Sequence, residues 1–134
     1  MARTAITITT LVPNGSVLNP ATTAVDQANG MNVALPSTAI PVAPDMDHMI
    51  LVIAATGASP FNAIIRAGVG GGSTPGAAFR SGLGDLTISV TNATTRWFGP
   101  FDVSRFMQTD GSLNLDFGVG FTGTVAAVLM PVRW

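Results

Sequence analysis

The chain has no cysteine, lysine, glutamate or tyrosine, so arginine and aspartate carry all of its fixed side-chain charge. The lack of cysteine excludes disulfide scaffolds, thiol catalysis and zinc sites built from thiolates. Only 10% of the residues are charged and the net charge is -1, which leaves no basic surface for nucleic acid to bind. Because sparse charge and low net charge favour association, we expect a subunit of an assembly rather than a freely diffusing monomer.

Long apolar segments are missing as well. The longest apolar run, residues 49–55, is far shorter than the roughly 20 residues that a membrane-spanning helix needs. Threonine alternates with isoleucine at residues 6–9, so the N-terminus lacks the apolar segment of a secretory signal. We therefore expect a protein that is made in the cytoplasm without a signal peptide and that has no membrane partner.

The apolar residues that are present follow a period of two. Apolar and polar side chains alternate at residues 6–9, 86–91 and 112–117, as in strands with one buried face. Residues 49–55 and 125–130 are apolar throughout, which indicates strands covered on both faces, by a second sheet or by a neighbouring subunit. No window of 11 residues keeps a helical period, and residues 102–105 fit at most one short turn of helix.

Turn-forming residues separate these segments. Asp110-Gly111 lies between residues 106–108 and 113–115, where it is expected to close a β-hairpin. We predict an all-β protein, a single-domain β-sandwich or small β-barrel of about seven to nine short strands with long Gly- and Pro-rich loops. The single domain spans residues 1–134, with residues 1–30 as an N-terminal arm and loop and residues 68–84 as a Gly-rich loop.

Two glycine- and aspartate-bearing segments invite chemical interpretations. Residues 70–76 are rich in glycine, but a phosphate-binding loop needs lysine, and Pro75 interrupts the helix that a dinucleotide-binding motif requires. Asp45, Asp47 and His48 are metal-ligand types in one cluster. Their position directly before the apolar run favours polar residues at the start of a strand over a metal site.

Other catalytic or metal-binding sets are weak. Asp110, Ser112, Asn114 and Asp116 place oxygen ligands at alternate positions, yet an EF-hand loop ends on a glutamate that the chain lacks. The polar face of a strand explains this pattern better. With one histidine and no cysteine, lysine or tyrosine, most general acid–base and nucleophilic arrangements are absent. We expect no enzyme and no cofactor.

Aromatic and arginine residues form the clearest candidate interaction site. Trp97 and Phe101 flank Gly99-Pro100, Arg105 follows, and Trp134 ends the sequence. These residue types are enriched at protein interfaces, so we expect all four to contact the chain's own copies or a partner. The alternatives are that some of the rings fill the core or that they form a ligand-binding platform. A further hypothesis is ion pairing among the charged residues of this segment, which are Arg96, Asp102, Arg105 and Asp110.

The sequence resembles the small head decoration, or minor capsid, proteins of tailed bacteriophages, especially those that infect actinobacteria. The segments that carry the resemblance are residues 4–5, 23–26, 29–31, 84–86, 96–101, 104–108 and 110–117. The likeness covers most of the chain and is weakest at residues 68–78. The likeness is one of overall pattern, and it assigns no functional residues to this chain.

This resemblance implies a function. It implies a β-rich structural protein on the outside of an icosahedral head, bound to the major capsid protein, often as a homotrimer, that stabilises the shell against the pressure of the packaged DNA. The protein would be made in the host cytoplasm and reside on the virion. The alternative is a carbohydrate- or receptor-binding β-module on a virion or tail, which exposed, coplanar aromatic rings around Trp97 would favour.

Overall fold

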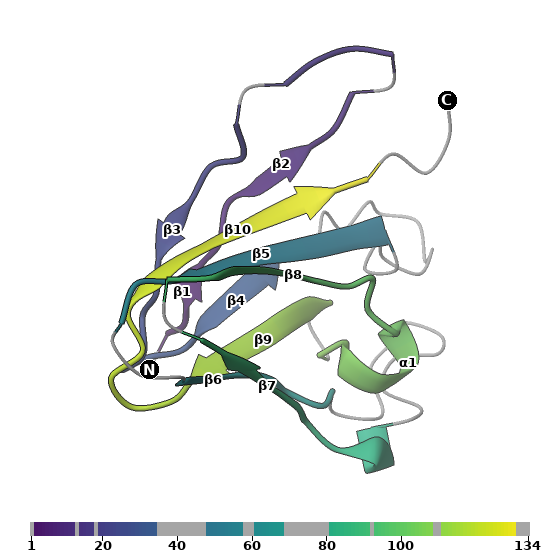
Figure 1. Cartoon of the computed structure of the whole chain (residues 1–134). Helices are drawn as coiled ribbons and strands as arrows, with labels where there is room; N and C mark the ends of the chain where they lie inside the picture. Colours follow the sequence, from purple (N-terminus) through teal and green to yellow (C-terminus); the bar gives the residue numbers. More distant parts are fainter. Residues whose placement is uncertain are drawn as a thin grey trace.

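Two mixed β-sheets pack face to face (Figure 1). The computed structural model describes residues 2–12, 14–17, 19–34, 48–57, 61–68, 81–91, 93–108 and 111–130. In order across the first sheet, the strands are β1 (Thr4–Ala5), β4 (Met31–Ala34), β9 (Ser112–Phe117), β6 (Phe61–Ile65) and β7 (Leu86–Val90). The second sheet has β2 (Ile8–Thr10), β10 (Gly123–Leu129), β5 (Met49–Ala55) and β8 (Thr95–Phe98) in order, and β3 (Thr23–Ala24) pairs with β10 beside β2.

The fold is therefore all-β, as predicted, and it is a sandwich. Neither sheet closes into a barrel in the part of the chain that the structure describes. The described strands number ten, more than expected, because β1 and β3 are two-residue pairings that are too short to leave a periodic pattern. The strands expected at residues 49–55, 86–91, 112–117 and 125–130 are confirmed as β5, β7, β9 and β10.

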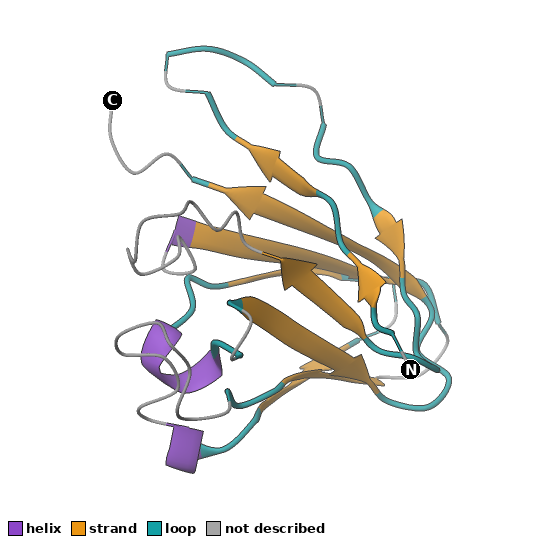
Figure 2. Cartoon of the chain, turned by 180° about the vertical axis from the view of Figure 1, so that it is seen from behind, coloured by secondary structure: helices purple, strands orange, loops and turns teal. Residues whose placement is uncertain are grey.

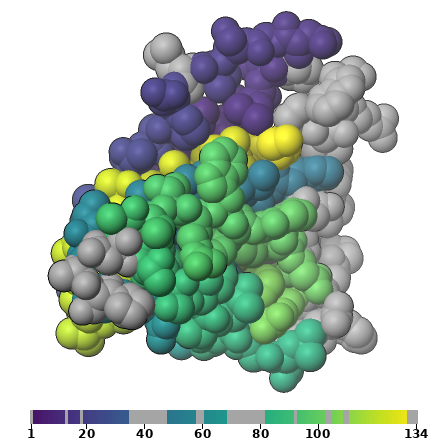
Figure 3. Space-filling model, in the orientation of Figure 1, coloured from purple at the N-terminus to yellow at the C-terminus, as the bar shows by residue number. Residues whose placement is uncertain are grey.

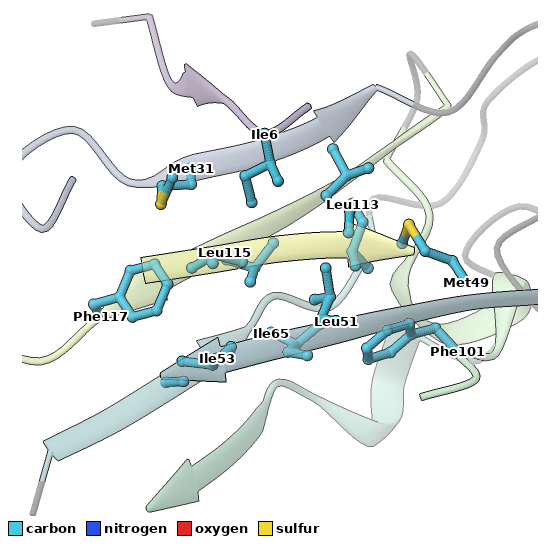
Figure 4. Packing of buried hydrophobic residues seen from close by; sticks show 14 of the residues in the cluster. Ile6, Met31, Met49, Leu51, Ile53, Ile65, Phe101, Leu113, Leu115 and Phe117 are labelled. Atoms are coloured by element: carbon cyan, nitrogen blue, oxygen red, sulfur yellow. The ribbon is translucent and has the colours of Figure 1, made fainter. Parts of the chain in front are cut away.

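The core lies between the two sheets. It consists of alternate residues of their strands together with Ile6, Phe101, Phe106, Met107 and Phe121 from the segments between strands. In β5 every second side chain is buried and the side chains between them are half-buried, as expected for a strand whose one face lies on the core. The side chains of β5 and β9 meet in this core, and Figure 4 shows Met49, Leu51 and Ile53 from β5 with Leu113, Leu115 and Phe117 from β9.

The N-terminal segment contributes to both sheets. β1 pairs in parallel with β4 of the first sheet, and β2 pairs in parallel with β10 of the second. Ile6, between them, is 4% exposed and belongs to the core, and its N–H donates to the Asn32 carbonyl at 2.9 Å. The alternation at residues 6–9 thus predicts extended chain correctly but not its division between two sheets. Residues 4–10 are edge strands of the chain's own sandwich.

The hairpin expected at Asp110-Gly111 is wrong in one respect. Asp110 lies outside the described residues. On either side of it the Gln108 N–H donates to the Ser112 carbonyl at 2.9 Å, and the Gly111 N–H donates to the Gln108 carbonyl at 2.9 Å. The chain leads into β9 from a short helix, α1 (Val103–Phe106), rather than from a strand. Phe106, the last residue of α1, and Met107 after it are both buried and belong to the core cluster.

The short helical elements lie together at one end of the sandwich (Figure 2). They are α1 and a 3-10 turn, η2 (Ser81–Leu83). The position of α1 agrees with the short turn expected at residues 102–105. Among the described residues, no helix has the length and apolar composition to cross a membrane.

Candidate functional site

The four residues expected at an interface have different environments. Trp97, on β8, is 66% exposed. Phe101 is 3% exposed and packs edge to face against Phe106 in the core, with ring centroids 6.1 Å apart. Its ring fills the core, which is one of the alternatives considered for these aromatic residues. Trp134 lies outside the described residues.

Arg105 is engaged within the chain. Its Nε donates to the Gly84 carbonyl at 3.0 Å and its Nη2 to the Asp85 carbonyl at 3.3 Å. The guanidinium also lies 4.7 Å from the centroid of the Phe106 ring, a cation–π arrangement. Arg105 thus joins α1 to the start of β7 through backbone carbonyls. Asp110, one of the aspartates considered as an ion-pair partner, lies outside the described residues.

The outer face of the second sheet is apolar. The strand register places one group of side chains on the face of this sheet opposite the core: Ile50, Val52, Ala54, Trp97, Ala126 and Val128. Within the chain itself Ala126 and Val128 are already buried, each 4% exposed, and Ile50, Val52 and Ala54 are half-buried, so Trp97 is the exposed member of the group. Threonines at positions 9, 95 and 124 border this group. The described strands of this sheet place no charged side chain on this face. We call it the apolar outer face, and it fits the expectation that residues 49–55 and 125–130 are covered on both sides.

The outer face of the first sheet is polar. The residues of β4, β6, β7 and β9 that alternate with the core residues are Asn32, Ala34, Asn62, Ile64, Thr87, Ser89, Ser112, Asn114 and Asp116. Most of them carry amide, hydroxyl or carboxylate groups. Ser112 is buried, at 3% exposed, and the others are half-buried or exposed. We call this the polar outer face. The sandwich therefore presents two chemically different outer surfaces, one suited to solvent and one suited to burial.

A set of ion pairs ties the N-terminus to the polar outer face. Asp116 accepts hydrogen bonds from Arg3 Nη1 at 2.5 Å and from Arg66 Nε, and Arg66 Nη1 donates to Asp85 Oδ2 at 2.7 Å. Burial raises the pKa of Asp116, but the hydrogen bonds from Arg3 and Arg66 outweigh it, so the pKa lies below its ordinary value. The Ala67 N–H is the main cause of a lowered pKa at Asp85.

Sequence reasoning missed these ion pairs. Asp116 was placed on the polar face of a strand, but its arginine partners lie 113 and 50 residues away in the chain. Only the topology, with β1 and β6 both reaching the neighbourhood of β9, brings them together. The alternation of β9 signalled an outward carboxylate, and nothing in the local sequence signalled its partners.

The described residues contain no assembled metal centre. No three histidine, cysteine, aspartate or glutamate side chains among them lie close enough to hold an ion. Asp45 and Asp47 of the cluster near His48, and Asp110 of the calcium-like pattern, lie outside the described residues. Asp116, which ends that pattern, instead binds two arginines.

Among the described strands, β8 forms one edge of the second sheet, and β2 and β3 form the other. The only neighbour of β8 in the described strand order is β5, with Trp97 opposite Val52 and Arg96 opposite Ile53. The side chains of Thr95, Arg96 and Trp97 are exposed. An edge strand offers unpaired peptide groups to another chain, so this edge and the adjoining apolar outer face form the candidate interaction surface. Comparison of the chain with protein-family models, curated proteins and solved structures gives no match.

Proposed function

We propose that the chain is a structural virion protein that decorates the outer surface of an icosahedral phage capsid and stabilises it by bridging capsomers. The observation that carries the proposal is the contrast between the two outer faces of the sandwich. The apolar outer face is turned toward the major capsid protein or a neighbouring copy, and the polar outer face is turned toward solvent. The resemblance of the sequence to phage decoration proteins supports the same function.

A protein of this kind needs surface complementarity rather than chemistry. Each apolar contact contributes about 25 cal/mol per Å² of surface removed from water. Contacts of one copy, or of a homotrimer, with several capsomers reinforce one another, because the first contact raises the effective concentration of the next. Modest individual contacts therefore give tight overall binding. The sparse charge of the chain suits a surface that is largely covered in the assembly.

Co-sedimentation with undecorated shells of the phage tests this function. The wild-type protein should bind with saturation at a fixed number of copies per shell and should raise the temperature at which the shell releases its contents. Binding to glycans in place of shells would overturn the proposal and favour the carbohydrate-binding alternative. That alternative has one exposed ring, Trp97, in support within the described residues.

A matched pair of substitutions tests the orientation. Val52→Asn and Ile64→Asn each replace a half-buried, outward, aliphatic side chain in a strand with neighbours on both sides, one on the apolar and one on the polar outer face. Val52→Asn should weaken shell binding by about tenfold, or 1.4 kcal/mol, and Ile64→Asn should leave it unchanged. Equal binding by both variants would contradict the assignment of the apolar outer face to the shell.

A further inference from the structure

The edge of the second sheet at β8 has its peptide groups arranged for an added strand. The Ala55 N–H donates to the Thr94 carbonyl at 3.0 Å. Hydrogen-bonded and non-bonded pairs alternate along antiparallel strands, so Arg96 and Phe98 direct their peptide groups toward β5. Thr95 and Trp97 therefore direct their N–H and C=O groups away from the sheet. Figure 3 shows the green part of the chain that includes β8 at the near surface of the molecule.

The side chains of β8 differ on its two faces. Trp97 lies opposite Val52 at the margin of the apolar outer face and is 66% exposed. Arg96 projects from the other face of the strand and makes no hydrogen bond or ion pair with any described residue. By contrast, Arg3, Arg66 and Arg105 are all held by carboxylates or backbone carbonyls.

Arg96 also restricts what can pair with this edge. Two copies of β8 paired antiparallel, with Thr95 of each opposite Trp97 of the other, would place the two Arg96 side chains directly opposite one another. Like charges in such cross-strand positions are destabilising, whereas an opposite charge is stabilising. The edge therefore disfavours this pairing with its own copy and favours a strand that carries a carboxylate opposite Arg96.

We propose that β8 is the docking edge for an extended acidic segment of the capsid protein, which adds to the second sheet as a further strand. The peptide groups of Thr95 and Trp97 bind its backbone, Arg96 binds its carboxylate, and Trp97 covers an apolar side chain next to it. Main-chain pairing of this kind supplies affinity and the side chains supply selectivity. The inference rests on the proposed function and assigns the partner's conformation and charge.

The test uses full-length protein and undecorated shells, with binding measured by co-sedimentation. Arg96→Glu should weaken binding at least tenfold, and Arg96→Lys should stay within about threefold of wild type. A double variant, Thr87→Asp with Ser89→Asp, changes the net charge by as much as Arg96→Glu does, but at exposed positions of β7. This variant should bind shells as the wild type does. Raising the salt concentration should weaken the wild type more than Arg96→Gln.

Thr95→Pro provides an independent test of the backbone contact. Proline is tolerated on an edge strand where the N–H faces solvent, so this variant should keep its melting temperature and lose shell binding. If the wild type fails to bind shells, the proposed function itself is wrong. If the wild type binds and both Arg96→Glu and Thr95→Pro bind equally well, the function stands and the docking edge is overturned. A change in the oligomeric state of free Arg96→Glu would make β8 a contact between copies and would also overturn it.

Discussion

At the scale of single residues, Asp116 connects three distant parts of the chain. Its carboxylate holds Arg3, near the N-terminus, and Arg66, which follows β6, while Asp116 itself lies on β9. Its side chain is 22% exposed, which is less than the 43% of Arg66. Removing a half-buried carboxylate that holds two charged donors costs more than removing one partner of a surface ion pair, because water compensates less for the lost contacts.

Asp116→Asn should lower the free energy of unfolding at pH 7 by about 1–3 kcal/mol, since Arg3 loses its charged acceptor and Arg66 keeps only Asp85. Urea denaturation followed by tryptophan fluorescence measures the loss. Asp85→Asn is the matched control, because Asp85 also binds Arg66 but is 36% exposed, and it should cost less than about 1 kcal/mol. An equal loss in the two variants would show that Asp116 is no more than a surface partner.

Gly30 lies against the same ion pair. Its φ is +72°, and a Cβ built there would overlap the guanidinium of Arg3 and the carboxylate of Asp116. Gly84 has a similar φ of +77° but nothing within 4 Å of the equivalent position. The two glycines therefore share a left-handed backbone conformation that would strain an alanine, and they differ in steric surroundings.

Gly84→Ala should cost about 1 kcal/mol of unfolding free energy from backbone strain alone. Gly30→Ala should cost about 2–4 kcal/mol, because it adds displacement of the ion pair to the same strain. Thermal and urea unfolding of the two variants and the wild type give both values. Similar losses in the two variants would mean that Arg3 and Asp116 move aside freely.

At the scale of elements, the N-terminal segment is held by a turn as well as by pairing. Asp26 accepts a hydrogen bond from the Thr4 hydroxyl of β1 at 2.5 Å, and it also accepts bonds from the Asn29 N–H at 3.1 Å and the Asn29 side-chain amide at 3.0 Å. With the Thr4 hydroxyl as the largest cause, these bonds lower the pKa of Asp26 to about 2. The ionised carboxylate thus fastens β1 to the turn that precedes β4.

This lowered pKa predicts a defined pH window. A carboxyl whose pKa is lower in the folded state stabilises the fold above its unfolded pKa, and the contribution disappears as pH falls through the folded pKa. Wild type should therefore be more stable than Asp26→Asn at pH 6, and the difference should shrink between about pH 4 and pH 2. Urea unfolding of both proteins across this range measures it. A difference that stays constant with pH would contradict the role of the ionised Asp26.

The elements also show how far sequence reasoning extends. Alternation predicts β7 and β9, because a strand with one buried face needs a period of two, and continuous apolar runs predict β5 and β10. The same alternation could not show that residues 4–10 leave one sheet and join the other, since both halves are extended and half-buried. Composition likewise could not separate Trp97 from Phe101. Only the packing of α1 against the sandwich shows that the second ring is buried.

At the scale of the whole molecule, the two sheets differ in the charged residues that they carry. The described ion pairs gather on the first sheet and its connections, where Arg3, Arg66, Asp85 and Asp116 stabilise the sandwich from its polar side. In the described strands of the second sheet, Arg96 is the only charged residue, and it lies on the edge strand β8. The ion pairs of the first sheet thus stabilise the fold, and in our proposal Arg96 at the edge of the second sheet recognises the partner.

The proposed orientation predicts how the fluorescence of Trp97 changes when the protein binds shells. In a Trp134→Phe background Trp97 is the sole tryptophan, so its emission reports the margin of the apolar outer face. Binding of saturating shells should shift the emission to shorter wavelength and reduce acrylamide quenching several-fold, because the ring leaves water. The control protein carries Trp97→Phe and Thr87→Trp in the same background, which moves the probe to the polar outer face. Emission is compared at shell concentrations at which co-sedimentation shows the control to be bound. The emission of the control should stay unchanged on binding, and a shift in the control without one at Trp97 would reverse the proposed orientation.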